Sequence, residues 1–216
     1  MDLTAKDSTD KDFSVADDGT LLSVEVGASG IPAPAQTMEK TLVGDGDLQS
    51  IDKNLDDIDI NYDIEWTARD GRDKNATISG DGTLLSVEVS TNEIPTAVKS
   101  NISGRMNGGK LGSIDENFDD TGTNFDVEIT SANGSKNSFT VAMDGTLSSE
   151  EINPARIPPA AMRTIKDRIG EGKILRIDKS FIKQDGVMPY EVEGRKDGKP
   201  FDFSVGPRGR FLGMDD

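Results

Sequence analysis

Apolar and polar residues alternate along several short segments of this chain. In residues 62–67, Tyr, Ile and Trp take every second position and Asp, Glu and Thr take the positions between them. Residues 125–130 show the same alternation. Successive side chains of a β-strand point to opposite faces of the sheet. Both segments are therefore predicted to be strands with one apolar and one polar face, and Trp66 is expected in the core rather than in a sugar-binding site.

Turn signals link further strand-like segments into hairpins. Asp-Gly is a favoured hairpin turn because Gly adopts a positive φ at low cost. Apolar-rich segments flank four such dipeptides, of which the last has Arg in place of Asp: Asp18-Gly19, Asp81-Gly82, Asp144-Gly145 and Arg208-Gly209. Four hairpins are predicted.

Three helices are predicted to begin at Ile-Pro pairs, because Pro suits the first turn of a helix. The pairs are Ile31-Pro32, Ile94-Pro95 and Ile157-Pro158. After the second and third pairs, apolar residues recur at every fourth position, which is typical of a helix with one buried stripe. Glu39 interrupts the first stripe. There we expect Met38 and Leu42 to carry the packing.

These landmarks recur at a fixed step of 63 residues. Residues 18–26 return letter for letter at 81–89 and in weaker form at 144–152, and the Ile-Pro pairs keep the same step. A period set by independent landmarks is the mark of a repeat architecture. The predicted fold class is α+β, with tandem repeats of one helix packed on a four-stranded antiparallel sheet whose other face is open to solvent.

The step also predicts how the chain is divided. Residues 1–11 show no periodicity and are expected to be a disordered leader. They lack the apolar segment of a signal peptide, so any signal segment is expected outside this chain. The remaining divisions are an N-terminal hairpin from a partial repeat over 12–30 and repeats over 31–93, 94–156 and 157–216.

Charge favours a basic protein as partner. The chain holds 40 acidic and 24 basic residues, a net charge of −16. Residues 153–216 contain 10 acidic and 13 basic residues, so the excess of acid lies in residues 1–152. This charge repels nucleic acid and anionic lipid headgroups. No apolar run approaches the ~20 residues that cross a bilayer, so no membrane insertion is expected.

The absence of two residue types argues against an enzyme. The chain contains no Cys and no His. Thiol nucleophiles, imidazole bases and the usual zinc, copper and haem ligands are therefore missing. A single short helix over a sheet also offers no deep apolar pocket of the kind that raises the pKa of a catalytic acid. We expect no catalytic residues and no cofactor.

The order of the landmarks resembles the PepSY-like family, whose members share a fold with the repeats of β-lactamase inhibitory protein. The resemblance covers about residues 13–212 and rests on the Asp-Gly hairpins and on the motifs Tyr-Asp-Ile-Glu at 62–65, Phe-Asp-Val-Glu at 125–128 and Tyr-Glu-Val-Glu at 190–193. It implies a periplasmic or secreted bacterial protein of largely unknown function. It also implies that the protein lacks enzymatic activity and binds or inhibits another protein.

The open polar face of the strands is the candidate partner-binding surface, because it would be flat, rigid and repeated. The alternative is that its acids are only the solvated half of amphipathic strands. The candidate residues are Glu25, Asp63, Glu65, Glu88, Asp126 and Glu128.

Acid clusters leave a second function open. Residues 45–47, 56–59 and 119–120 could bind calcium through carboxylates, although they do not fit the spacing of an EF-hand loop. The alternative hypothesis is therefore a calcium-stabilised structural or adhesion array. The oligomeric state is not predicted.

Overall fold

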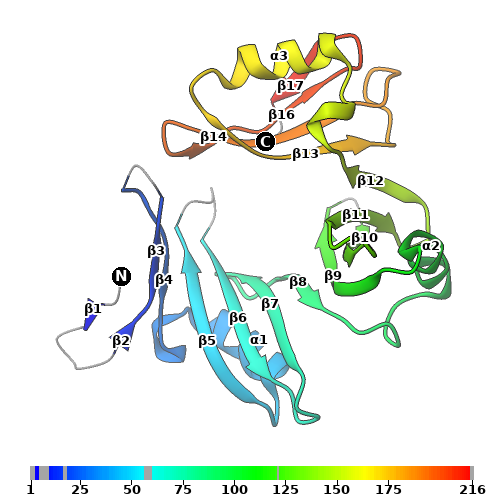
Figure 1. Ribbon diagram of the computed structural model, residues 1–216. Coiled ribbons are helices and arrows are strands. Elements are labelled where there is room, and N and C mark those ends of the chain that lie inside the picture. Colours follow the sequence, from blue (N-terminus) through cyan, green and yellow to red (C-terminus); the bar gives the residue numbers. More distant parts are fainter. Residues whose placement is uncertain (1–2, 5–9, 17–18, 56–59, 121, 215–216) are drawn as a thin grey trace. The chain divides into compact units, whose positions relative to one another are not determined.

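A computed structural model (Figure 1) describes residues 3–4, 10–16, 19–55, 60–120 and 122–214. Its helices are η1 (Ala28–Gly30), α1 (Ala33–Val43), α2 (Thr96–Met106), η2 (Pro154–Arg156) and α3 (Pro159–Ile169). The first strands are β1 (Leu3–Thr4), β2 (Asp10–Lys11), β3 (Phe13–Val15), β4 (Leu21–Glu25), β5 (Asp47–Asn54), β6 (Asn61–Thr67), β7 (Asp73–Ser79) and β8 (Leu84–Glu88). The others are β9 (Lys110–Asp119), β10 (Gly122–Thr130), β11 (Lys136–Ala142), β12 (Leu147–Glu151), β13 (Lys173–Ser180), β14 (Tyr190–Lys196), β15 (Lys199–Pro200), β16 (Phe203–Val205) and β17 (Phe211–Met214).

Fifteen of these strands form one hydrogen-bonded sheet, which corrects the predicted fold class. The order is β17-β16-β14-β13-β12-β11-β10-β9-β8-β7-β6-β5-β4-β3, with β15 beside β14. The expectation of separate four-stranded sheets, each with its own helix, is wrong. The three helices and the hairpins exist, but the strand ladder continues from one hairpin to the next segment.

The continuity comes from the second strand of each hairpin. β4 pairs with β5, β8 with β9 and β12 with β13, all antiparallel. A strand left at a sheet edge exposes unpaired N–H and C=O groups, which readily take up another strand. The strand that follows each helix satisfies these groups, so the ladder does not stop at the predicted repeat boundary.

Contacts between residues divide the chain into two compact units. The first unit comprises residues 1–89 and 115–122, and the second comprises residues 90–114 and 123–216. None of the helices in the described residues is long and apolar enough to cross a membrane.

The core of the first unit lies between α1 and the sheet, where α1 packs on β6 and β7. Trp66 is only 4% exposed, which confirms the predicted core position. The buried residues of this core are Ile31, Ala35, Ile51, Tyr62, Ile64, Trp66, Ala76 and Ile78.

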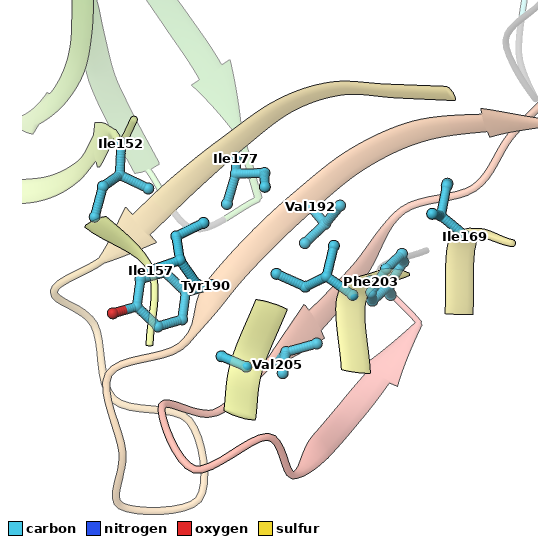
Figure 2. Close-up of a cluster of buried hydrophobic side chains, with 10 residues drawn as sticks. Ile152, Ile157, Ile169, Ile177, Tyr190, Val192, Phe203 and Val205 are labelled. Carbon is cyan, nitrogen blue, oxygen red and sulfur yellow. The ribbon is translucent and has the colours of Figure 1, made fainter. Parts of the chain in front are cut away.

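The second unit has a core beneath α3, which packs on β14 and β16 (Figure 2). Phe203 is fully buried at its centre, and its ring lies 5.6 Å from that of Phe201 and 6.4 Å from that of Phe211. The Arg168 guanidinium lies over the Phe211 ring, 3.7 Å from its centroid. The other buried residues are Ile152, Ile157, Ala161, Ile165, Ile169, Ile177, Tyr190, Val192 and Val205.

The first helix differs from the predicted packing at one position. Met38 and Leu42 pack against the core, as expected. Glu39 nevertheless stays on the buried stripe and is only 5% exposed. Its Oε2 atom is buried and has no hydrogen-bond partner among the residues that the structure describes. The helix periodicity therefore decides where this side chain points, despite its charge.

The hairpin turns bring glycines close to the helix N-termini. Gly82 and Gly145 have φ of +86° and +85°, as the Asp-Gly signal predicts. A Cβ atom at either position would come within 2.8 Å of the backbone of Pro34 or Ala97. Glycine is thus required by backbone conformation and by space.

Two predictions fall partly on residues outside the description. Asp18 of the first hairpin turn lies among the undescribed residues, although β3 pairs with β4 around it. In the predicted leader, β1 pairs with β2. The rest of residues 1–9 lies outside the described residues.

Candidate functional site

The polar face of the first unit, the side of β4 to β8 opposite α1, carries three carboxylates in direct register. Asp52 of β5 lies opposite Glu25 of β4 on one side and Asp63 of β6 on the other. Their neighbours Ile51 and Ile64 are buried on the other face, as the alternation predicts. Like charges directly opposite one another destabilise a sheet, so this row needs compensation.

Neutral donors supply part of that compensation at β6. Asp63 accepts hydrogen bonds from Asn54 Nδ2 at 2.9 Å and from Thr77 Oγ1 at 2.7 Å. The Glu65 carboxylate accepts one from Ser50 Oγ at 3.4 Å. These bonds hold the carboxylates in place without cancelling their charge.

Asp52 has no such support. It is half-buried, and no hydrogen bond reaches its side chain from the described residues. Burial raises the pKa of Asp52, and repulsion from Glu25, Glu65, Asp63 and Asp12 raises it further. The charged form of this carboxyl is therefore disfavoured in the folded protein.

Glu88 extends the acidic surface to β8. Its Oε2 accepts a hydrogen bond from Asn75 Nδ2 at 3.0 Å. Burial raises the pKa of Glu88 and the neighbouring Asp115 adds to the rise, while Lys74 and Arg72 oppose it. An open hollow of ≈ 380 Å³ is lined in part by Glu65, Asn75 and Glu88. This end of the face is less strongly acidic than the row at Asp52.

The other two candidate residues belong to the second unit, and one of them is paired with a lysine. Asp126 of β10 accepts a hydrogen bond from Thr140 Oγ1 at 2.6 Å. The Glu128 carboxylate is paired with Lys136 Nζ at 2.9 Å. Four of the six candidates thus lie on the first unit and two on the second.

The second unit contains an ion pair that the sequence analysis did not single out. Arg176 Nε lies 2.7 Å from Asp178 Oδ2, and Arg176 Nη2 donates a hydrogen bond to Asp178 Oδ1 at 2.9 Å. Burial raises the pKa of Asp178, and the arginine offsets part of that rise. The pKa of Glu193 is likewise raised by burial and lowered in part by Arg176. The Arg176 guanidinium therefore offsets the negative charge of more than one acidic side chain.

Comparison with known proteins establishes no family for this chain. No family model matches it, and no curated protein matches it. Three solved structures from Bacteroides species are similar to it in part. One from Bacteroides thetaiotaomicron, described as a candidate calcium-regulated periplasmic protein, is 15% identical, with 60% of this chain and 97% of that chain covered and a TM-score of 0.39.

The other two structures are similar to this chain over comparable lengths. A periplasmic protein of the DUF2874 family from Bacteroides vulgatus is 19% identical over 63% of this chain and 99% of that chain, with a TM-score of 0.38. A BLIP-like protein from Bacteroides fragilis is 22% identical over 55% of this chain and 84% of that chain, also with a TM-score of 0.38. TM-scores of this size do not establish a shared fold.

The comparisons bear only loosely on the resemblance drawn from the sequence. A BLIP-like protein is among the similar structures, two of the three are described as periplasmic, and none is described as an enzyme. Membership of the PepSY-like family stays a prediction.

The acid clusters considered for calcium do not form a metal site in the described part of the chain. There, no group of three or more acidic side chains is placed to hold a metal ion. Asp45 instead lies 3.6 Å from Arg69, and Asp119 accepts a hydrogen bond from the backbone N of Gly122 at 3.1 Å. Residues 56–59 lie outside the described residues.

Asp52→Asn should stabilise the protein at neutral pH. A carboxyl whose pKa is higher in the folded than in the unfolded protein opposes folding at pH values above both pKa values, and this effect vanishes below both. The advantage of the variant should therefore shrink as the pH falls through the acid range. Urea unfolding of both proteins at pH 7 and at pH 4 measures it, and an advantage that grows in acid would contradict the assignment.

Proposed function

We propose that this chain is a non-enzymatic protein of the bacterial envelope or exterior that binds a basic protein through the polar face of its first unit. The expected location rests on the sequence resemblance. The binding proposal rests on Glu25, Asp52, Asp63 and Glu65 of the first unit, none of which forms an ion pair with a basic side chain of the described residues.

The distribution of ion pairs supports this choice of surface. In the second unit, basic side chains already compensate Glu128 and Asp178. On the first unit, the groups that bond Glu25, Asp63 and Glu65 are backbone, amide and hydroxyl groups. The first unit, residues 1–89 and 115–122, holds 24 acidic and 7 basic residues, a net charge of −17. Such a surface attracts a positively charged protein and speeds its association.

A charge-matched pair of variants tests the proposal. Glu25→Gln with Glu65→Gln removes two charges from the face, and Asp45→Asn with Asp70→Asn removes two charges from loops away from it. Both carboxylates of the control pair are solvent-exposed and bonded only to arginines. A protein captured from a bacterial envelope extract by the wild-type chain would be purified and titrated against all three.

The expected result is an affinity about tenfold lower for the face variant and little changed for the control. The loss should diminish at high salt, because ions screen exposed charges. Equal affinities for the two variants would show that net charge, and not this face, governs binding.

A further inference from the structure

β5 and β13 place an acidic residue in the same surroundings. Asp52 is the sixth residue of β5, and Asp178 is the sixth residue of β13. Asp52 lies between Glu25 and Asp63. In the same way, Asp178 of β13 lies opposite Glu151 of β12 on one side and Glu191 of β14 on the other. Each row therefore sets one carboxylate between two others.

The fourth residue of each strand differs. It is Ser50 in β5 and Arg176 in β13, and each directly follows an irregularity in the strand register. Ser50 lies opposite Glu65, and Arg176 lies opposite Glu193. The two positions thus have the same local backbone setting, but only one carries a cation.

In the second unit this cation is bound within the chain. Arg176 Nη2 donates a hydrogen bond to Asp178 Oδ1 at 2.9 Å, and Nε lies 2.7 Å from Oδ2 but has no hydrogen-bond partner among the described residues. The Asp178 side chain is only 8% exposed. Glu193 and Asp126 add to the attraction. A planar guanidinium presents several N–H donors to a carboxylate at once, which the compact ammonium of lysine cannot reproduce.

In the first unit the place of that guanidinium is taken by a serine hydroxyl. Ser50 Oγ donates a hydrogen bond to Glu65 at 3.4 Å, and in the described part of the chain no hydrogen bond reaches the Asp52 side chain. Asp52, Glu25 and Asp63 therefore keep a repulsion that Arg176 relieves in the second unit.

We propose that Asp52 is the acceptor for an arginine side chain of the protein partner. The proposal rests on the proposed function and narrows it, because it names the group that the basic partner presents. The partner's guanidinium would take the position beside Asp52 that Arg176 holds beside Asp178 and would pair with the Asp52 carboxylate in the same way. Ser50 occupies the position in β5 that Arg176 occupies in β13, and its side chain is much shorter than that of arginine.

Oligo-arginine and oligo-lysine peptides of equal length are the probes. Titrated calorimetrically into the full chain at low salt, the arginine peptide should bind about fivefold more tightly than the lysine peptide. Asp52→Asn should abolish this preference while keeping weaker binding of both. Ser50→Arg, which supplies the guanidinium from within the chain as in the second unit, should also abolish it.

The outcomes separate the two proposals. If both peptides bind equally to the wild-type chain, or if the preference survives Asp52→Asn, the arginine site is wrong. The proposed face still stands in that case, provided Glu25→Gln with Glu65→Gln weakens binding of both peptides. If neither peptide binds the wild-type chain, the proposed function fails and the arginine site fails with it.

Discussion

Replacing Arg176 by serine should lower the free energy of unfolding by about 2–3 kcal/mol. The substitution leaves Asp178, whose side chain is only 8% exposed, without its counter-ion. Removing one partner of a buried pair costs about 3–5 kcal/mol, and the one-third exposure of the arginine places this pair below that range. Urea unfolding at neutral pH measures the loss.

Two comparisons identify the cause of that loss. Adding Asp178→Asn to Arg176→Ser should restore part of the stability, because the unpaired charge is removed. The deficit of the single variant should also shrink in acid, since protonation of Asp178 removes the charge that lacks a partner. A deficit that is independent of pH and unaffected by the second substitution would instead point to lost packing of the arginine stem.

Local structure could be predicted from the sequence because it depends on neighbours along the chain. Alternation placed Tyr62 and Trp66 in the core, and the Ile-Pro pairs marked the three helices. The strand ladder between hairpins could not be predicted in the same way. Alternation determines which face a side chain takes, but it does not say which strand will satisfy the free edge of β4, β8 or β12.

The candidate site also combines features that depend on local sequence with features that depend on strand pairing. Alternation put Asp63 and Glu65 on the polar face, where the structure has them. It could not distinguish them from Asp52, because their hydrogen bonds come from neighbouring strands and depend on register. The register changes between Leu48 and Ser50, and no residue type marks that irregularity in advance.

Charge placement in the second unit could have been foreseen in part. Arg176 stands 126 residues after Ser50, so the two are related by two steps of the 63-residue period. When residues two steps of the period apart are aligned, Arg176 stands where the first copy has a serine, so the sequence itself shows a basic residue on the polar face. Its bond to Asp178 nevertheless requires the pairing of β12, β13 and β14.

Glu39→Ile should raise the free energy of unfolding by about 2 kcal/mol or more. Glu39 is the seventh residue of α1, and Ile102 and Ile165 are the seventh residues of α2 and α3. All three are at most 5% exposed. Burial of the Glu39 Oε2 atom, which has no hydrogen-bond partner among the described residues, lowers the free energy of unfolding. Burial of the apolar isoleucine side chains at the other two positions raises it.

A matched variant separates the two contributions. Glu39→Gln keeps the size of the side chain and removes only the charge, so its unfolding free energy should lie between those of the wild type and Glu39→Ile. Chemical unfolding of the three proteins at neutral pH gives the comparison. If isoleucine lowers the stability, the helix must hold Glu39 for a partner outside the described contacts, and the apolar stripe of α1 would not be equivalent to those of α2 and α3.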